Sequence, residues 1–413
     1  MNDPRHRGLL NGARLNMHFR HDSSSVNVRA IATLVLAAAA LTGCADAPAG
    51  LDPSARGAIT EASNISSRDL GSDGPGAVYA LTNAGDGNSV VAFRRAEDGT
   101  LSPLGTFATG GRGSGGTIDP LASQFAVVVN DAHEALFAVN AGSDEISSFR
   151  ITSRGALALV STQSSRGKRP NSIAVHGNLL YVLNAGDNTV SGFRVTGDAR
   201  LVPLPHTSRS LSSGADGAAA IRFTPDGEKL IVAERLSNRL EVFAVRPDGR
   251  LSDPILTPGN GGASFGFDIT AHNQPIVSET QGSLTSYALD AGGRLTPITA
   301  SISTGGRAPC WVILTANGRF AYTTNSGSDF LAGFGVDDAG HLTSLTPGVP
   351  TGRTGAGSSP IDLDRVGSRY LYTLDAGTGA IGSFVINSDG TLVARPAVPA
   401  GDPASGMQGL ASF

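Results

Sequence analysis

The sequence predicts an all-β fold, a seven-bladed β-propeller, because one pattern recurs seven times along its 413 residues. In each copy an apolar run leads into a small-residue turn, a second run ends on an aromatic residue, and a Gly/Asp-rich turn precedes a third run. Glycine and aspartate tolerate the positive φ that tight hairpins need. A fourth apolar run lies upstream in most copies. Four short strands in roughly 40–50 residues are typical of a propeller blade.

Residues 181–204 carry the clearest copy, and the other copies align with it on the aromatic residue. The aligned aromatics lie 44 to 56 residues apart: Phe93, Phe149, Phe193, Phe243, Tyr287, Phe334 and Phe384. After a first blade at about 77–107, we expect the others at about 118–163, 169–209, 217–257, 264–302, 307–350 and 358–398. A pair of β-sandwiches with coincidental similarity is the alternative.

The first copy, from Ala77 to Phe107, contains only three strand-like runs. A further run, residues 409–413, lies at the C-terminus, where a new blade would begin. We expect this run to become the innermost strand of the first blade. Such pairing closes the ring and removes the two strand edges that an open ring would expose.

The first 44 residues differ from the repeats and are typical of a secretory signal. A basic lead with Arg20 and Arg29 precedes an apolar run at 30–41, which is shorter than the roughly 20 residues needed to cross a membrane. The tetrad 41–44, Leu-Thr-Gly-Cys, resembles a bacterial lipobox, and that resemblance implies cleavage before Cys44 and a diacylglycerol on its sulfur. An ordinary secreted protein with a coincidental cysteine is the alternative, and Met17 is an alternative start.

These segments predict three parts: a lipoprotein signal peptide at 1–43, a flexible tether at 44–76 and the propeller at 77–413. The tether is rich in Ala, Ser, Gly, Asp and Pro and has no sustained hydrophobic period. We therefore expect an extracytoplasmic protein of the cell envelope, held to a bacterial membrane only through its lipid. It would face the periplasm or the cell surface.

Composition narrows the function classes. The formal net charge is −4 with scattered charges, whereas a nucleic-acid-binding domain usually carries a basic stripe. With Cys44 lipidated, Cys310 has no disulfide partner, and a domain of this size folds without one. No His/Cys spacing suits zinc. We expect no nucleic acid, no cofactor and no resident metal, and a monomer whose partner is a small anionic substrate or a protein of the envelope.

In a propeller the innermost strands line a central channel, and we expect the end where these strands begin to open as a ligand funnel. Arg169 and Arg307 precede prolines at the starts of inner strands, with Asn171 just after, and a guanidinium group there can clamp a carboxylate or phosphate. Bridging between blades is the alternative role for these arginines.

Glu234 is the predicted catalytic acid/base. It occupies a position that most sister repeats fill with asparagine, at Asn83, Asn140, Asn184 and Asn325. Glu279 stands in a similar place in the fifth blade and is a predicted substrate-binding residue. A carboxylate at a position where the other repeats have asparagine often marks a functional site. A solvated or arginine-paired carboxylate is the alternative.

From about Ala77 onward the chain resembles the lactonase-type seven-bladed propellers, which include bacterial propeller-type 6-phosphogluconolactonases and fungal carboxymuconate cyclases and share YVTN-like repeats. The matching segments are 181–188 (YVLNAGDN), 223–227 (FTPDG), 234–238 (ERLSN) and 308–312 (APCWV). The resemblance implies a hydrolase that acts on a small lactone, without a cofactor.

The catalytic pattern of that family is only partly present. Where catalytic members carry Pro-His-x-His in the third blade, this chain has Pro170, Asn171, Ser172 and Ile173. Their Pro-Arg-His of the fourth blade is replaced by alanines at 218–220, and only Glu234 keeps its chemical type. Two hypotheses follow: a lactonase-like hydrolase or isomerase with Glu234 as acid/base, and a non-catalytic binding propeller of the cell envelope.

Overall fold

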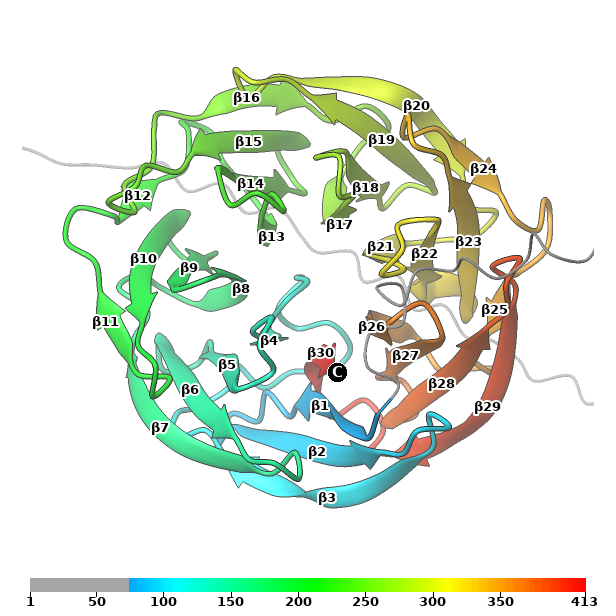
Figure 1. Ribbon diagram of the computed structural model, residues 1–413, viewed down its shortest axis with the longest axis horizontal. Helices are drawn as coiled ribbons and strands as arrows, with labels where there is room; N and C mark the ends of the chain where they lie inside the picture. Colours follow the sequence, from blue (N-terminus) through cyan, green and yellow to red (C-terminus); the bar gives the residue numbers. More distant parts are fainter. Residues whose placement is uncertain (1–73) are drawn as a thin grey trace, which may run out of the picture. The chain divides into compact units, whose positions relative to one another are not determined.

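The computed structural model describes residues 74–413, in which seven antiparallel sheets form a closed ring (Figure 1). The predicted signal peptide, Cys44 and nearly all of the tether lie outside the described residues. The seven-bladed propeller predicted from the repeats is confirmed. No helix within residues 74–413 is long and apolar enough to cross a bilayer.

Each blade runs from an inner strand beside the channel to an outer strand at the rim. The first blade consists of β30 (Gln408–Ser412), β1 (Gly76–Leu81), β2 (Ser89–Arg95) and β3 (Leu101–Ala108). The second consists of β4 (Val127–Val129), β5 (Ala135–Asn140), β6 (Glu145–Ile151) and β7 (Leu157–Ser164). The third consists of β8 (Pro170–His176), β9 (Leu179–Asn184), β10 (Thr189–Val195) and β11 (Leu201–Pro203), and the short strand β12 (Arg209–Ser210) also pairs with β10.

The next two blades are β13 (Ala218–Phe223), β14 (Lys229–Glu234), β15 (Arg239–Ala244) and β16 (Ile255–Pro258); and β17 (Ser264–Ile269), β18 (Pro275–Glu279), β19 (Ser283–Leu289) and β20 (Leu295–Ser303). The sixth blade consists of β21 (Pro309–Leu314), β22 (Phe320–Asn325), β23 (Phe330–Val336) and β24 (Leu342–Ser344); the short strand β25 (Gly352–Arg353) also pairs with β23, and the 3-10 turn η1 (Ser326–Ser328) follows β22. The seventh consists of β26 (Pro360–Val366), β27 (Tyr370–Asp375), β28 (Ala380–Ile386) and β29 (Leu392–Pro399).

The hydrophobic core lies between neighbouring blades. The second strands are nearly continuous apolar runs, such as β5 (ALFAVN), whose residues are all buried because both faces of a blade pack on its neighbours. The repeated aromatic that aligned the copies is at most 2% exposed in every blade. Outer strands are mostly exposed, as in β3, in which only Leu101 is buried. The repeat pattern in the sequence is therefore the pattern of the core.

Tyrosines on the second strands connect neighbouring blades. The hydroxyl of Tyr79 donates to the carbonyl of Gly155 in the next blade at 2.7 Å, and Tyr322 does the same to Gly390 at 2.7 Å. Both glycines lie in predicted hairpin turns and have φ near +80°. Such a turn exposes its carbonyl to the side, so one residue type both forms the turn and accepts the bond between blades.

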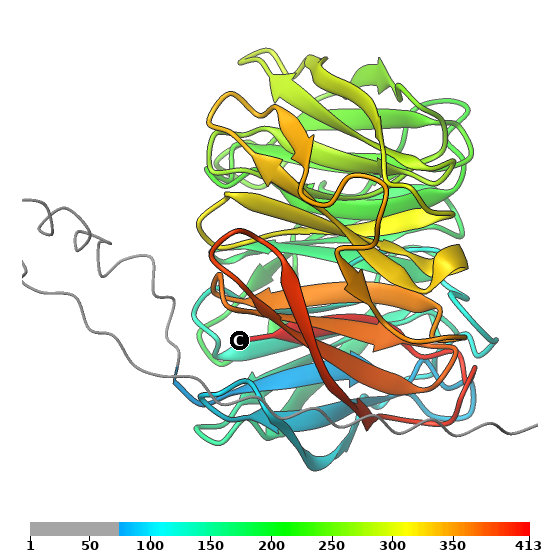
Figure 2. The same ribbon diagram turned by 90° about the vertical axis from the view of Figure 1, so that its right-hand side faces the viewer.

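The C-terminal strand closes the ring as predicted. β30 pairs antiparallel with β1, with Tyr79 opposite Ala411, and Figure 2 shows the red last strand beside the blue first strand. On its other side, the Ser412 amide donates to a carboxylate oxygen of Asp364 in the seventh blade at 2.6 Å. The last strand thus bonds to the first and the seventh blade at once.

Residues 117–126 cross one end of the channel. The amide of Gln124 donates to Ala219 in the fourth blade, its side-chain amide donates to Val312 in the sixth at 2.7 Å, and its carbonyl accepts from Ser172 in the third. The neighbouring Ser123 carbonyl accepts from Trp311 at 2.8 Å. Because one residue bonds to three blades that surround the channel, the segment fills the end where the inner strands begin. The prediction of an open funnel at that end is wrong.

Candidate functional site

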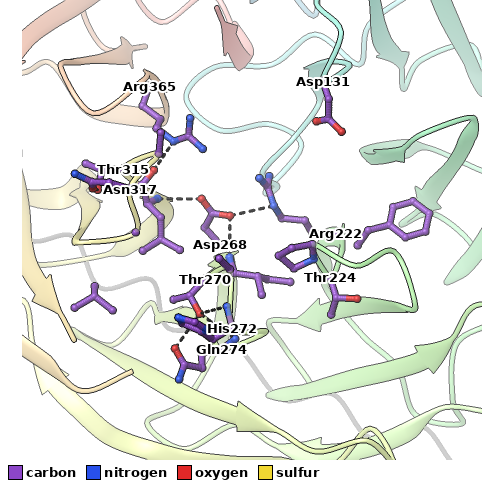
Figure 3. A pocket seen from close by; sticks show the side chains of 18 of the residues that line it. Asp131, Arg222, Thr224, Asp268, Thr270, His272, Gln274, Thr315, Asn317 and Arg365 are labelled. Carbon is purple, nitrogen blue, oxygen red and sulfur yellow. Dashed lines mark hydrogen bonds and ion pairs between the residues drawn. The ribbon is translucent and has the colours of Figure 1, made fainter. Parts of the chain in front are cut away.

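A cavity of about 600 Å³ lies at the other end of the channel, where the inner strands finish (Figure 3). Its floor and walls come from the last residues of β8, β13, β17, β21 and β26 and from the turns that follow them. Cavities of this size accommodate small metabolites and cofactors. The lining is mixed, with threonine, asparagine, glutamine and histidine side chains among apolar ones, and with charged groups that the following paragraphs describe.

Arg222 and Asp268 form the central ion pair of this cavity. Arg222 lies on β13 and Asp268 on β17, and the Arg222 Nε lies 3.0 Å from an Asp268 carboxylate oxygen. The Asp268 carboxylate also accepts the Leu314 amide of the sixth blade at 2.9 Å and is only 2% exposed. The Arg222 guanidinium stacks 4.7 Å from the centre of the Phe125 ring. Asp268 thereby orients Arg222 through its Nε, and the terminal nitrogens of the Arg222 guanidinium point into the cavity.

Arg365 on β26 reaches the same cavity from the seventh blade. Its Nε donates to the Leu314 carbonyl at 2.5 Å. The adjacent Asp364 turns its carboxylate toward Ser412 instead, which donates through both its amide and its hydroxyl. Burial raises the pKa of Asp364 above its ordinary value. In Figure 3 the guanidinium groups of Arg365 and Arg222 both point into the space above Asp268.

Asp131 supplies an exposed carboxylate on the far side of this space. It follows β4 and lines the cavity together with Val128 and Val129 of that strand. Figure 3 shows Asp131 across the open space from Arg365, with Arg222 between Asp131 and Asp268. His176 and His272 also line the cavity, but the His176 ring is packed against Phe223 at 5.7 Å between ring centres. Of these groups, Asp131 and the two arginines are placed to face a small molecule.

The predicted acid/base Glu234 lies elsewhere, at the end of β14. It is fully buried, and one of its oxygens accepts from Ser237 and from the Arg239 Nε at 2.8 Å. Arg239 also lies 3.7 Å from Glu241, whose carboxylate accepts the Ser212 amide and hydroxyl. Burial and the neighbouring Glu241 carboxylate raise the pKa of Glu234 to about 7. Glu234 is thus one half of a buried carboxylate pair and does not line the cavity.

Glu279 holds the equivalent place at the end of β18. It accepts hydrogen bonds from the Gly261 amide at 2.7 Å and from the hydroxyls of Ser283, Thr285 and Ser301. The asparagines of the sister blades anchor the same joints: Asn325 accepts from Thr304 at 2.7 Å. Each of these side chains ties a second strand to the loop that joins two blades. The carboxylate of Glu279 is saturated by donors and lies outside the cavity.

The other three predicted site residues lie at the crossed end of the channel or on the surface. Arg169 is exposed and donates to the carbonyl of Pro120 in the crossing segment at 2.7 Å. Arg307 is exposed and donates to Gly327 of its own blade. Asn171 is buried and donates to Ala218 of the fourth blade at 2.8 Å. The structure does not gather these residues with Glu234 and Glu279 into one site: each has separate partners, and none lines the cavity.

Within residues 74–413 no group of three or more His, Cys, Asp or Glu side chains is arranged to hold a metal ion. Cys310 is a free, buried thiol, and burial raises its pKa far above the ordinary value. A thiol in that state is a weak nucleophile.

Sequence reasoning missed Arg222, Asp268 and Arg365, although a signal was present. Arg222 and Asp268 are each the only charged residue of an inner strand, as in Ile221-Arg222-Phe223, whereas Arg365 follows two aspartates of its own strand. The sister strand β8 has Ala174 at the position of Arg222, since both residues follow an isoleucine that pairs with a valine of the second strand. Aligning β8 and β13 on that isoleucine would have shown the charge at Arg222.

The model of the lactonase family of seven-bladed β-propellers matches residues 86–204 and 127–308, which together cover more than half of the chain. The chain belongs to this family. The comparison with curated protein sequences finds no match.

Several solved structures share the fold. One is a Bacteroides uniformis protein with a provisional 6-phosphogluconolactonase assignment: it has 18% sequence identity and a TM-score of 0.68, and the match covers 83% of this chain and 100% of that one. Another is the periplasmic gluconolactonase of Pseudomonas aeruginosa, with 19% identity, a TM-score of 0.64, and coverage of 81% of this chain and 98% of that one. At such identities the likeness concerns the fold.

Proposed function

We propose that the protein is a lactonase-type hydrolase, which opens a small anionic lactone with water in the cavity at the end of the channel. Membership of the lactonase propeller family supports a hydrolase of this type. One observation carries the placement of the site: the Arg222 guanidinium, oriented by Asp268, faces the same small cavity as the exposed carboxylate of Asp131.

Hydrolysis of a lactone requires a base for water and a donor for the oxygen that becomes negative. Asp131 takes a proton from water as the water oxygen bonds to the carbonyl carbon. Arg222 stabilises the resulting oxyanion. The bond between that carbon and the ring oxygen then breaks, and the proton on Asp131 passes to the leaving ring oxygen. The product is the open hydroxy acid, and Asp131 is a carboxylate again.

The test is the initial rate of hydrolysis of sugar, phosphosugar and aliphatic lactones above the uncatalysed rate. The purified protein is compared with Asp131→Asn and Arg222→Met. We expect losses of about 10²–10⁴-fold for Asp131→Asn and of about 10²–10³-fold for Arg222→Met. Arg250→Met is the matched control, because Arg250 pairs with Asp248 at an exposed turn and does not line the cavity.

The sequence-predicted acid/base is tested beside them with Glu234→Gln. If turnover is lost in that variant and kept in Asp131→Asn, the reaction belongs to Glu234 and the cavity proposal is wrong. If folded protein hydrolyses no lactone in the panel, the proposal of an enzyme fails.

A non-catalytic binding propeller of the cell envelope is the second candidate. The observation that favours it is that Ser123 and Gln124 occupy the channel end where the inner strands begin. At the same end the family's histidine positions hold Asn171 and Ile173. Capture of a specific envelope protein or glycan by inactive, folded protein would favour this function.

A further inference from the structure

Residues 117–126, the crossing segment, contact both ends of the channel. At the filled end, the Gln124 side chain donates to the Val312 carbonyl at 2.7 Å. Toward the cavity, the centre of the Phe125 ring lies 4.7 Å from the guanidinium carbon of Arg222. A movement of the crossing segment that shifts Phe125 therefore changes the surroundings of Arg222.

The backbone of the crossing segment is held in a conformation that residues with a side chain rarely adopt. The φ values of Asp119, Ala122 and Phe125 are 51°, 47° and 68°. In this left-handed region the Cβ atom crowds the backbone, so each such residue costs conformational energy. The closed position persists because bonds to the surrounding blades outweigh that cost, among them the 2.7 Å bond from the Ser123 hydroxyl to the Asn171 carbonyl. Loss of a favourable interaction in the segment therefore shifts the balance toward opening.

Asp119 is the residue of the segment whose charge changes this balance. Its Oδ1 is buried and receives no hydrogen bond from residues 74–413. Groups from four other elements interact with this carboxyl: Gln408 on β30, Arg235 after β14, Asp362 on β26 and Cys310 on β21. Arg235 attracts a charged Asp119, whereas negative charge on Asp362 repels it. Burial outweighs the favourable contacts and raises the pKa of Asp119 from an ordinary 3.8 to about 7.

A neutral Asp119 therefore fits the closed segment better than a charged one. The closed state has its full preference below about pH 3.8, and this preference is lost as the pH rises through about 7. One pKa unit corresponds to a tenfold change in an equilibrium constant. The ratio of open to closed segments should thus rise about tenfold per pH unit over this range and level off above it.

We propose that the crossing segment is a pH-dependent plug, closed over the channel end while Asp119 is protonated and released from that end when Asp119 becomes a carboxylate. The plug itself does not depend on the proposed function. Only its consequence for the cavity rests on that function: release withdraws Phe125 from Arg222, and the guanidinium then loses a group that fixes its orientation.

Hydrogen–deuterium exchange measures this opening without turnover. The purified full chain is labelled between pH 5 and 8, and each rate is corrected for the intrinsic exchange rate at that pH. Relative to peptides of β5, peptides covering 117–126 should lose protection about tenfold per pH unit up to about pH 7 and little above it. Asp119→Asn keeps a neutral side chain, so its crossing segment should stay protected throughout.

Asp375→Asn is the matched control. Burial raises the pKa of Asp375 to about 7 as well, but its carboxylate accepts from Thr373 of its own strand. The crossing segment of this variant should open as in wild type. Arg235→Met is a second variant: it removes an attraction to charged Asp119, so the loss of protection should continue to a higher pH than in wild type.

Protection of 117–126 that does not change with pH in wild type would overturn the inference, as would an equal pH dependence in Asp119→Asn. If Asp119→Asn does not fold, a pH dependence left unmoved by Arg235→Met would overturn it instead. In the lactone assay, the ratio of kcat in Asp119→Asn to kcat in wild type should rise between pH 5 and 8. A constant ratio would refute the link to Arg222 and leave the plug. If no lactone is hydrolysed, the proposed function fails and the exchange data still decide the plug.

Discussion

Replacing Glu234 by glutamine should flatten the pH dependence of the protein's stability. Glu234 and Glu241 are both fully buried next to a single arginine, Arg239. Two neighbouring carboxylates on one guanidinium are best accommodated when they share a proton. A glutamine at 234 imitates the protonated acid, since its amide can donate where the carboxyl proton would.

The magnitude follows from the pKa of Glu234, which rises from an ordinary 4.5 to about 7. The folded state holds the proton more tightly than the unfolded state, so this group's contribution is fully present below about pH 4.5 and is lost as the pH rises through about 7. At about 1.4 kcal/mol for each pKa unit, the loss is roughly 3–4 kcal/mol at most. Glu234→Gln has no titratable group at this position, so its stability does not show this loss as the pH rises.

The assay is urea unfolding between pH 5 and 8, followed through the fluorescence of Trp311, the only tryptophan of the chain and a buried one. Burial also raises the pKa values of Asp119 and Asp375 to about 7, so the wild-type protein loses stability through these groups as well. The difference between the unfolding free energies of wild type and Glu234→Gln, followed across this pH range, gives the contribution of Glu234 alone. Parallel curves for the two proteins across this pH range would refute the shared proton.

Four further predictions concern the fold and the anchor. Deleting residues 407–413 removes β30 and should lower the melting temperature sharply, so an unchanged melting temperature would contradict ring closure. Gln124→Ala leaves the Val312 carbonyl without its donor and should cost about 1–3 kcal/mol in urea unfolding; no change would mean that the crossing segment is dispensable. Tyr322→Phe removes the bond to Gly390 and should cost about 0.5–1.5 kcal/mol by the same measurement. Cys44→Ser should move the protein from the membrane to the soluble fraction of cells, whereas unchanged fractionation would contradict the lipid anchor.

The blades could be predicted from the sequence because their determinants are local. A hairpin turn with Gly155 or Gly390 needs a positive φ, and an aromatic such as Phe193 at a regular spacing marks a buried position of each third strand. These signals recur within every 44 to 56 residues, so the repeat reveals itself by self-similarity. Closure by β30 was predictable for a related reason: the first copy lacked one strand, and the last run had no blade of its own.

The candidate site was not predictable in the same way. Each blade contributes one inner strand to the channel, so Arg222, Asp268 and Arg365 meet only after the ring has closed. The unusual carboxylate at Glu234 was recognised as a departure from the repeat, but the sequence could not show that it faces Glu241 and Arg239 rather than the channel.

The sequence by itself therefore determined the number of blades, their strands and the closure of the ring, because backbone turns and alternating burial depend on neighbours along the chain. Only the tertiary structure decided which end of the channel is filled and which is hollow. Residues 117–126 carry no regular period, and their place follows from the partners that Ser123 and Gln124 find on four different blades. Such contacts join residues up to 285 positions apart, a separation at which local pattern carries no information about proximity.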